Sequence, residues 1–241
     1  MSIFFSKIKL NFAQLWDIKT DWFEEPNQRR GGWSGVVRYK VPAKKGKIQS
    51  FIKRQENHFS RTWLHPFSGI PTFQKEFENI NRLIKHQIPT LEVLFFGKEH
   101  NRAIIVTKAL EDYVSLDQID PLSLSKKDKH LLLKHIAETL TKMHRVHYQH
   151  SSFYPKHIFV RQNADGWDVK IIDLENLRWR FFLRPIMNRD LSTLDRHLGS
   201  NWSVKDRLVF LHYYFDEKKL SNRAKRFWYK LQSKDAYKRR N

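Results

Sequence analysis

Alternating apolar and polar positions dominate the first part of the chain and predict β-strands. Residues 31–41 and 48–55 alternate in this way on either side of a glycine-containing turn, and residues 91–110 predict two more strands around a polar turn. Residues 73–87, which lie between these pairs, carry apolar side chains at helical spacing. This part of the chain is therefore predicted to be a small antiparallel sheet with one helix.

The hydrophobic pattern becomes helical in the second part of the chain. Residues 125–147 form a long amphipathic pattern, for which Ser125 is the predicted N-cap and Asp128 stands at capping-box spacing. A short strand pair is predicted at 157–161 and 168–173, and the pattern after it is mostly helical. A sheet-rich lobe is thus followed by a mainly helical lobe.

The composition is that of a globular domain without disulfides. The 241 residues are 40% hydrophobic and 14% aromatic, and none is cysteine. We predict an α+β fold with a single domain, in which residues 1–108 form the N-terminal lobe and residues 109–241 the C-terminal lobe. No apolar run is typical of a signal peptide or reaches the ~18 residues of a membrane span, so we expect a cytoplasmic protein.

The formal net charge of +20 indicates an anionic partner, such as nucleic acid, anionic lipid or a phosphorylated glycolipid. Residues 218–241 hold ten Lys and Arg and one Asp, with a patchy apolar face made by Leu220, Phe227, Trp228 and Leu231. This segment predicts a basic helix that lies on an anionic membrane surface, docks on its own lobe, or does both. No helix-turn-helix, RNA-recognition or zinc-finger pattern occurs, so no specific nucleic acid is expected.

Part of a phosphate-binding apparatus is predicted in the sheet-rich lobe. Gly32 and Gly35 match the latter part of the kinase pattern G-x-G-x-x-G-x-V, although Arg30 stands at the first glycine and a plain turn would use the same residues. Lys53 ends the stretch SFIK, as the lysine of V-A-I-K does. Glu76 lies on the helix face that should pack on the sheet, where a buried carboxylate needs a cation. We therefore predict that Lys53 and Glu76 pair.

The most specific local pattern is HSSFYPKHIFV followed by KIIDLEN. It has the order of the kinase catalytic loop H-R-D-x-x-x-x-N and of the strand that ends in a metal-binding Asp. His150 stands at the loop histidine, Ser152 at the catalytic Asp, and His157 at the metal-ligating position. Asp173 ends the apolar strand, where it either binds a metal or caps a turn.

Together these motifs resemble the lipopolysaccharide core kinases, the Kdo/WaaP group of heptose and Kdo kinases, and in particular its InaA-like branch. The resemblance covers residues 28–200 and rests on the order of RRGGWSGVVRY, FIKRQ, HPFSGIPTFQKEF, IPTLEVLFFG, HSSFYPKHIFV, IIDLENLR and RDLSTLDR. It implies a protein-kinase-like two-lobe fold that uses ATP and Mg²⁺ to phosphorylate a heptose or Kdo hydroxyl of the lipopolysaccharide inner core. It also implies peripheral contact with the anionic inner face of a Gram-negative inner membrane, where that glycolipid lies.

The resemblance also implies roles for single residues. Lys53 would hold ATP beneath the loop that contains Gly32 and Gly35, and Glu76 would orient Lys53. Asp173 would bind Mg²⁺ beside His157, which matches the loop histidine of heptose kinases in this family.

Ser152 is where the chain departs from the family. The family loop H-R-D-x-Y-x-x-H is retained at His150, Tyr154 and His157, but a serine hydroxyl is no base near neutral pH without help. Ser151, His150 or Tyr154 could orient the acceptor instead, so Ser152, His150 and Tyr154 are the catalytic candidates. The alternative is a pseudokinase, a nucleotide-binding or scaffold protein on the same fold.

Overall fold

The computed structural model describes residues 4–29, 31–44, 46–61, 65 and 67–238, and the chain divides into two compact units. Unit 1 comprises residues 1–84 and 90–111, and unit 2 comprises residues 85–89 and 112–241. The predicted lobe boundary after residue 108 lies close to this division. The segment 85–89 was expected in the first lobe, but it groups with unit 2, where the Pro89 carbonyl accepts a hydrogen bond from the Ile171 N–H at 3.1 Å.

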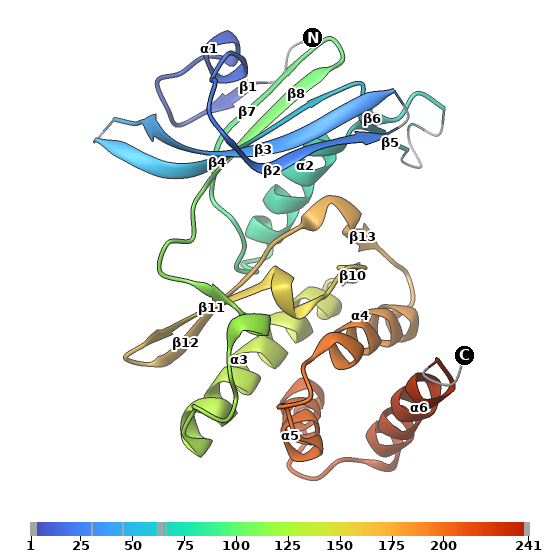
Figure 1. The fold of residues 1–241 in the computed structure, drawn as a ribbon. Helices are drawn as coiled ribbons and strands as arrows, with labels where there is room; N and C mark the ends of the chain where they lie inside the picture. Colours follow the sequence, from blue (N-terminus) through green and yellow to red (C-terminus); the bar gives the residue numbers. More distant parts are fainter. Residues whose placement is uncertain (1–3, 30, 45, 62–64, 66, 239–241) are drawn as a thin grey trace. The chain divides into compact units, whose positions relative to one another are not determined.

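Unit 1 is built on a six-stranded antiparallel sheet with the strand order β1-β7-β8-β4-β3-β2 (Figure 1). Its strands are β1 (Phe4–Ser6), β2 (Trp22–Arg29), β3 (Gly32–Pro42), β4 (Lys47–Glu56), β7 (Val93–Glu99) and β8 (Arg102–Lys108). The four strands predicted from alternation correspond to β3, β4, β7 and β8. The remaining two lie in the first 30 residues, where no element was predicted.

Two helices cover opposite faces of this sheet (Figure 1). The predicted helix is α2 (Thr72–Lys85), whose Phe77 ring stacks on Phe96 of β7 with 4.4 Å between centroids. The short α1 (Phe12–Trp16) was not predicted, and its buried Phe12 and Leu15 join the core on the other face. A small strand pair, β5 (Phe59–Ser60) and β6 (Ile70–Pro71), precedes α2.

Unit 2 is mainly helical, as predicted, and short strands flank the candidate catalytic loop, residues 150–157. Its helices are α3 (Lys126–Arg145), α4 (Leu183–His197), α5 (Val204–Phe215) and α6 (Asn222–Lys238), with 3₁₀ turns η1 (Leu116–Gln118), η2 (Pro155–His157) and η3 (Leu174–Asn176). Its strands are β9 (Val114–Ser115), β11 (Ile158–Asn163) and β12 (Gly166–Ile171) in one sheet, and β10 (Tyr148–Gln149) with β13 (Arg178–Trp179) in another. The predicted strand pair is β11 and β12.

Local capping explains where the long helix α3 begins. The Ser125 hydroxyl accepts a hydrogen bond from the Asp128 N–H at 3.1 Å, so the predicted N-cap is confirmed. At α5 the same device is a full capping box between Ser203 and Asp206. These caps fix the starts of two helices that pack on each other.

The predicted basic C-terminal helix is α6, and its apolar face packs on its own unit. Ala224 and Leu231 are buried, and the Phe227 ring lies 6.0 Å from that of Phe215 in α5. Residues 239–241 of the predicted segment lie outside the described residues. In the described part of the chain, no helix is both long and apolar enough to cross a bilayer.

Candidate active site

The predicted pair of Lys53 and Glu76 is present in unit 1. Lys53 Nζ on β4 lies 2.7 Å from Glu76 Oε1 on α2, and the Glu76 side chain is only 3% exposed. The Lys53 ammonium also lies 6.0 Å from the centroid of the Phe73 ring. A carboxylate buried to this extent is stable when a cation is held beside it, so strand β4 and helix α2 together fix the position of the lysine.

The two glycines predicted to cradle phosphate are both explained by packing inside unit 1. A Cβ on Gly32 would lie 2.2 Å from the Asn57 carbonyl oxygen, and one on Gly35 would lie 2.6 Å from the Trp22 ring. Strand pairing puts Gly35 opposite Arg54 and places Val36 opposite Lys53, so the side of Gly35 that Trp22 covers lies on the sheet face away from Lys53. Packing thus supplies another reason for both glycines, and phosphate binding by their backbone stays a prediction.

Gly31 is the glycine that sequence reasoning missed. It lies in the turn between β2, which ends at Arg29, and β3, which begins at Gly32, and it has a φ of +77° and open space where a side chain would be. A positive φ favours glycine, so this residue is needed for the turn itself. Its signal in the sequence was the Gly-Gly pair at 31–32.

In unit 2, His150 is a buried residue that holds the candidate catalytic loop in place through hydrogen bonds. It is fully buried, its Nε2–H donates to the Ile172 carbonyl at 2.9 Å, and its Nδ1 accepts from the Ser152 N–H at 3.3 Å. Burial is the main cause that lowers the pKa of His150 from 6.5 to about 4, so the ring is neutral at pH 7. Both nitrogens are used within the protein, which contradicts the expectation that His150 orients an acceptor. It is a positioning residue that ties the loop to the strand preceding Asp173.

The lowered pKa of His150 predicts a loss of stability in acid. Because the folded-state pKa lies below the unfolded value, stability is complete above pH 6.5 and declines as the pH falls towards 4, by about 3 kcal/mol in total. Urea unfolding between neutral pH and about pH 4.5 measures this decline. His150→Phe should flatten it, whereas the exposed His100→Asn serves as the control. If His150→Phe and His100→Asn changed the pH dependence of the free energy of unfolding equally, the prediction would be contradicted.

Asp190 on α4 holds the same loop and was not identified as a site residue from the sequence. It is fully buried and accepts hydrogen bonds from the N–H groups of His150 at 2.7 Å and Ser151 at 2.9 Å. His144 Nε2–H donates to it at 3.1 Å, and the Tyr214 hydroxyl lies 2.6 Å from the other nitrogen of His144. Burial, and second the charge of Asp190, raise the pKa of Tyr214, so that hydroxyl keeps its proton and can donate. The only signal in the sequence was the motif RDLSTLDR.

Among the side chains considered for acceptor binding, those of Ser152 and Tyr154 stay partly exposed. The neighbouring Ser151 is buried, and its hydroxyl accepts from Gln149 Nε2 at 2.9 Å, so it does not orient an acceptor. The Tyr154 ring packs edge-on against His157 at 5.5 Å and against His197 at 4.6 Å. Of the residues considered for acceptor binding, Ser152 and Tyr154 therefore fit the geometry.

His157 and Asp173 lie side by side at the end of the loop. His157 Nδ1 donates to the Ser152 carbonyl at 2.9 Å and lies 3.3 Å from Asp173 Oδ2. Asp173 has a left-handed backbone, with φ 60° and ψ 62°, and its side chain is 33% exposed. A non-glycine residue in this conformation is uncommon and is often found at functional sites.

The donor set fits Mg²⁺ through Asp173 rather than through His157. Among the described residues, no group of three or more His, Asp or Glu side chains could hold a metal ion. Mg²⁺ is commonly bound by one or two carboxylates, completed by phosphate oxygens and water, so the Asp173 carboxylate suffices. Imidazole is not a preferred Mg²⁺ ligand and Nδ1 of His157 is engaged. The contact with Asp173 gives His157 a positioning role, and its predicted role as a ligand stays a prediction.

Comparisons with known proteins find matches over most of the chain. Residues 13–214 match the model of the lipopolysaccharide kinase (Kdo/WaaP) family. Protein InaA of Escherichia coli (strain K12) is 29% identical over 198 residues, which cover 78% of this chain and 88% of InaA.

Two solved structures resemble the whole architecture. WaaP in complex with acyl carrier protein has a TM-score of 0.67 at 20% identity, with 99% of this chain and 97% of that chain covered. Aminoglycoside-3'-phosphotransferase of type VIII has a TM-score of 0.53 at 13% identity, with 88% of this chain and 92% of that chain covered. The α+β, protein-kinase-like fold predicted from the sequence is therefore confirmed.

Proposed function

Because the chain belongs to the lipopolysaccharide kinase (Kdo/WaaP) family, we propose that it is an ATP-dependent phosphotransferase acting on a heptose or Kdo hydroxyl of the lipopolysaccharide inner core. The observation that carries this proposal is the ion pair between Lys53 and the buried Glu76. A structural sheet has no need of a half-buried lysine fixed by an interior carboxylate, whereas a nucleotide-binding site does.

The chain's own residues divide the work of phosphoryl transfer between them. Lys53, held by Glu76, would bind the α- and β-phosphates of ATP, and Asp173 would hold Mg²⁺. Bound Mg²⁺ would neutralise negative charge on the phosphates. His157 fixes the orientation of the Asp173 carboxylate, and His150 and Asp190 fix the backbone of the loop that carries Ser152.

Acceptor binding is assigned to the partly exposed side chains of the loop. The Ser152 hydroxyl can hydrogen-bond a sugar hydroxyl, but it supplies no negative charge to receive its proton. General base catalysis typically contributes ~10²–10⁴-fold. In a loose phosphoryl-transfer transition state positioning and charge neutralisation matter more, so the proposed enzyme is slow rather than inactive.

Ser152→Asp should therefore raise phosphate transfer, by up to about a hundredfold, because it restores the base of the family loop. The loop needs no rebuilding, since its contacts to His150 and Asp190 run through backbone atoms. Initial rates with saturating ATP measure the effect, and Ser151→Asp, which puts the charge at a buried position, is the comparison. Unchanged or reduced transfer by Ser152→Asp would mean that this chain uses another acceptor arrangement.

The test of the proposed function is transfer of the labelled γ-phosphate of Mg-ATP into purified lipopolysaccharide. The acceptor comes from source cells that lack this protein, so that its site is empty. We expect label in the inner core with the unaltered protein and none with Lys53→Met, whose unbranched side chain is one atom shorter than that of lysine and has no charge. Label that is equal in both would refute the proposed role of Lys53.

A second candidate function is that of a pseudokinase, and Ser152 is the observation that favours it. On this reading the chain binds ATP through Lys53 and Asp173 but transfers no phosphate. ATP binding without transfer, both in the unaltered protein and in Ser152→Asp, would select this function.

We also propose a peripheral location on the anionic inner face of the inner membrane, with the lipopolysaccharide precursor as partner. The basic face of α6 supports it, because the helix has Lys225, Arg226 and Lys230 exposed while its apolar face packs on unit 2. Basic helices of this kind are attracted to anionic lipid.

A further inference from the structure

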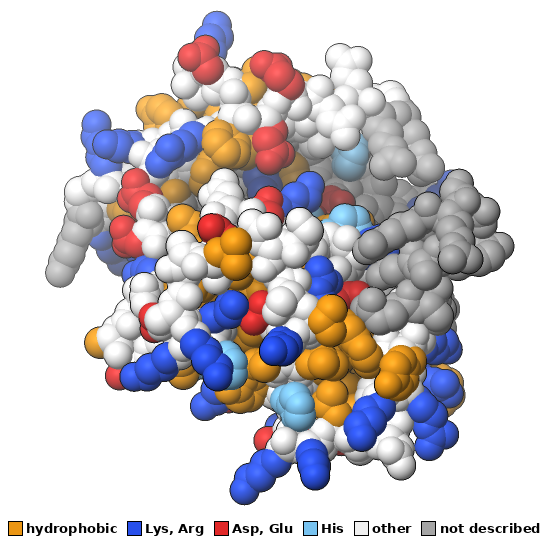
Figure 2. Space-filling model, turned by 60° about the horizontal axis from the view of Figure 1, so that its bottom comes forward, with side chains coloured by type: hydrophobic (Ala, Val, Ile, Leu, Met, Phe, Trp, Pro, Cys, Tyr) orange, Lys and Arg blue, Asp and Glu red, His pale blue; other side chains and the backbone are white. Residues whose placement is uncertain are grey.

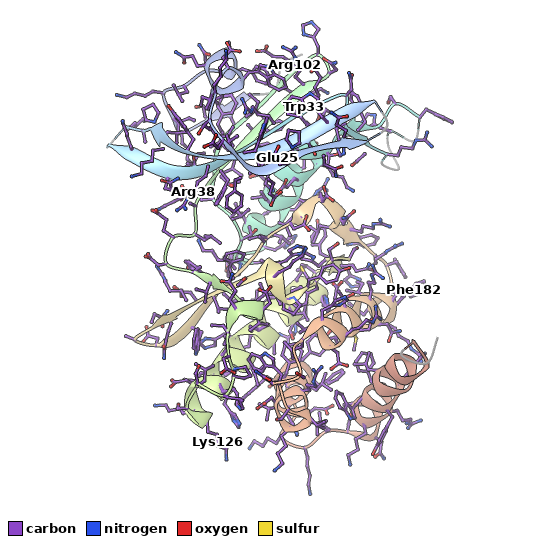
Figure 3. The ribbon with its side chains drawn as sticks, in the orientation of Figure 1. Glu25, Trp33, Arg38, Arg102, Lys126 and Phe182 are labelled. Carbon is purple, nitrogen blue, oxygen red and sulfur yellow. The ribbon has the colours of Figure 1, made fainter. Side chains whose placement is uncertain are left out.

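Unit 2 exposes a run of aromatic side chains interleaved with arginines, which we call the aromatic loop (residues 178–184, RWRFFLR). Trp179 is 58% exposed, Phe181 71% and Phe182 69%. Arg178, Arg180 and Arg184 are exposed between and beside them. No Asp or Glu occurs between residues 176 and 189. In Figure 3 the labelled Phe182 lies at the outer edge of unit 2, near the start of α4.

The aromatic loop is held in this exposed position by its backbone. Trp179 pairs with Tyr148 between β13 and β10, and the Arg180 N–H donates to the His147 carbonyl at 2.9 Å. The rings touch one another in sequence, with centroids 6.4 Å apart for Trp179 and Phe181 and 5.0 Å for Phe181 and Phe182. Exposing a connected apolar group on an anchored backbone opposes the hydrophobic effect, and such patches mark interaction sites.

A groove of about 610 Å³ begins at the end of the aromatic loop and is both cationic and apolar. Its lining comes from α4, α5 and α6, namely Arg184, Met187, Asn188, Phe215, Arg226, Phe227 and Lys230. Arg184 belongs to the loop and to the groove, so the two form one continuous surface. Figure 2 shows, on the face it turns forward, hydrophobic side chains lying among many Lys and Arg side chains.

The helix α6 cannot supply the apolar part of a membrane contact while it stays docked. Leu231 is buried, and Phe227 and Trp228 are half-buried. These members of the predicted apolar face are therefore already used, and Tyr229 is left as an exposed aromatic side chain among the cations of α6. The aromatic loop provides what these docked side chains do not, a connected group of exposed rings.

We propose that the aromatic loop and its adjoining groove dock unit 2 on an anionic lipid bilayer. Trp179, Phe181 and Phe182 lie at head-group depth, where aromatic side chains are favoured, and the arginines bind lipid phosphates. Arg184, Arg226 and Lys230 receive an anionic head group in the groove. The choice of a bilayer over other polyanions rests on the proposed function, because an inner-core glycolipid is anchored in a membrane. Aromatic and arginine side chains are also common at protein–protein interfaces, so an acidic soluble protein is the alternative occupant that the test must distinguish.

Vesicle binding and a site-specific label together test this docking without ATP or acceptor. The chain has no cysteine, so Phe182→Cys and the exposed control Phe67→Cys can each carry one polarity-sensitive fluorophore. We expect a blue shift at 182 on adding vesicles of phosphatidylcholine with phosphatidylglycerol, and none at 67 or with phosphatidylcholine alone. Binding without a shift at 182, or a shift produced by a purified acidic protein and not by vesicles, would overturn the proposal.

Paired substitutions separate the apolar and the charged contributions. The double change Phe181→Ser and Phe182→Ser should weaken binding to the anionic vesicles at least about tenfold. Arg180→Ala and Arg184→Ala should weaken it by about fivefold for each arginine. Lys126→Ala and Lys127→Ala remove equal charge from the start of α3 and should have a smaller effect. Equal losses in both charge pairs would indicate only nonspecific attraction and would refute this surface.

The two proposals fail in distinguishable ways. If the protein transfers no phosphate but binds vesicles with a shift at position 182, the proposed activity is refuted and the docking surface is supported. If it transfers phosphate to detergent-dispersed lipopolysaccharide but shows no shift at position 182, the activity is supported and the docking surface is refuted.

Discussion

Asp173→Asn should lower phosphate transfer about a thousandfold without unfolding the protein. The carboxylate charge that would hold Mg²⁺ is lost, and metal-based charge stabilisation is worth several kcal/mol of transition-state energy. Asparagine is the informative replacement because Asp173 has a φ of 60°, a conformation that asparagine accepts and alanine does not. Transfer of labelled phosphate, with unfolding by urea in parallel, measures both effects.

The matched control for this variant is Asp216→Asn. Asp216 is an exposed residue at the end of α5 and also has a left-handed backbone, with a φ of 54°. The same chemical change is thus made in the same conformation away from the loop, and transfer should stay near the unaltered rate. If both variants were equally active, Asp173 would not be the metal-binding residue.

Asp190→Ala should destabilise unit 2 by about 3–5 kcal/mol, the largest effect on stability that we expect from one substitution. It leaves the N–H groups of His150 and Ser151 without their acceptor in the interior, and it removes the partner of His144. The midpoint of urea unfolding measures the change. Under conditions where the variant is still folded, phosphate transfer should fall as well, because the backbone that carries Ser152 is no longer fixed.

Asp112→Ala is the comparison for this substitution. The Asp112 side chain is 79% exposed and forms an ion pair with Arg161 at 3.8 Å, so its loss should change stability by less than about 0.5 kcal/mol. A destabilisation of similar size in the two variants would show that the buried hydrogen bonds of Asp190 do not contribute the predicted stability.

The parts of the site that were predictable are those governed by local rules. Periodicity placed Glu76 on the buried face of its helix, and the cost of a buried carboxylate then identified Lys53 as its partner, which the 2.7 Å ion pair confirms. Chain order placed His150, Ser152 and Asp173 on one loop and strand end. Capping rules located the start of α3 at Ser125.

The parts that were missed depend on contacts between distant segments. Asp190 follows the loop by about forty residues, and no local pattern distinguishes a carboxylate that binds backbone N–H groups from one at the surface. The glycine spacing at 32 and 35 indicated a phosphate loop, but a sequence does not show that Trp22 fills the space over Gly35 and so gives this glycine a packing role too. In the same way, the apolar face of α6 was recognised but not what covers it.

Asp190 and His150 fix the backbone conformation of the loop independently of the side chain that would do the chemistry at position 152. Asp190 accepts hydrogen bonds from the backbone N–H groups of His150 and Ser151, and the His150 ring accepts one from the backbone N–H of Ser152. None of these three bonds uses the side chain at position 152. That side chain can therefore be exchanged during evolution without loss of the scaffold. Descendants of one ancestor could alternate between a fast kinase, a slow one and a nucleotide sensor while keeping a common loop conformation, and a protein engineer could follow the same route in reverse.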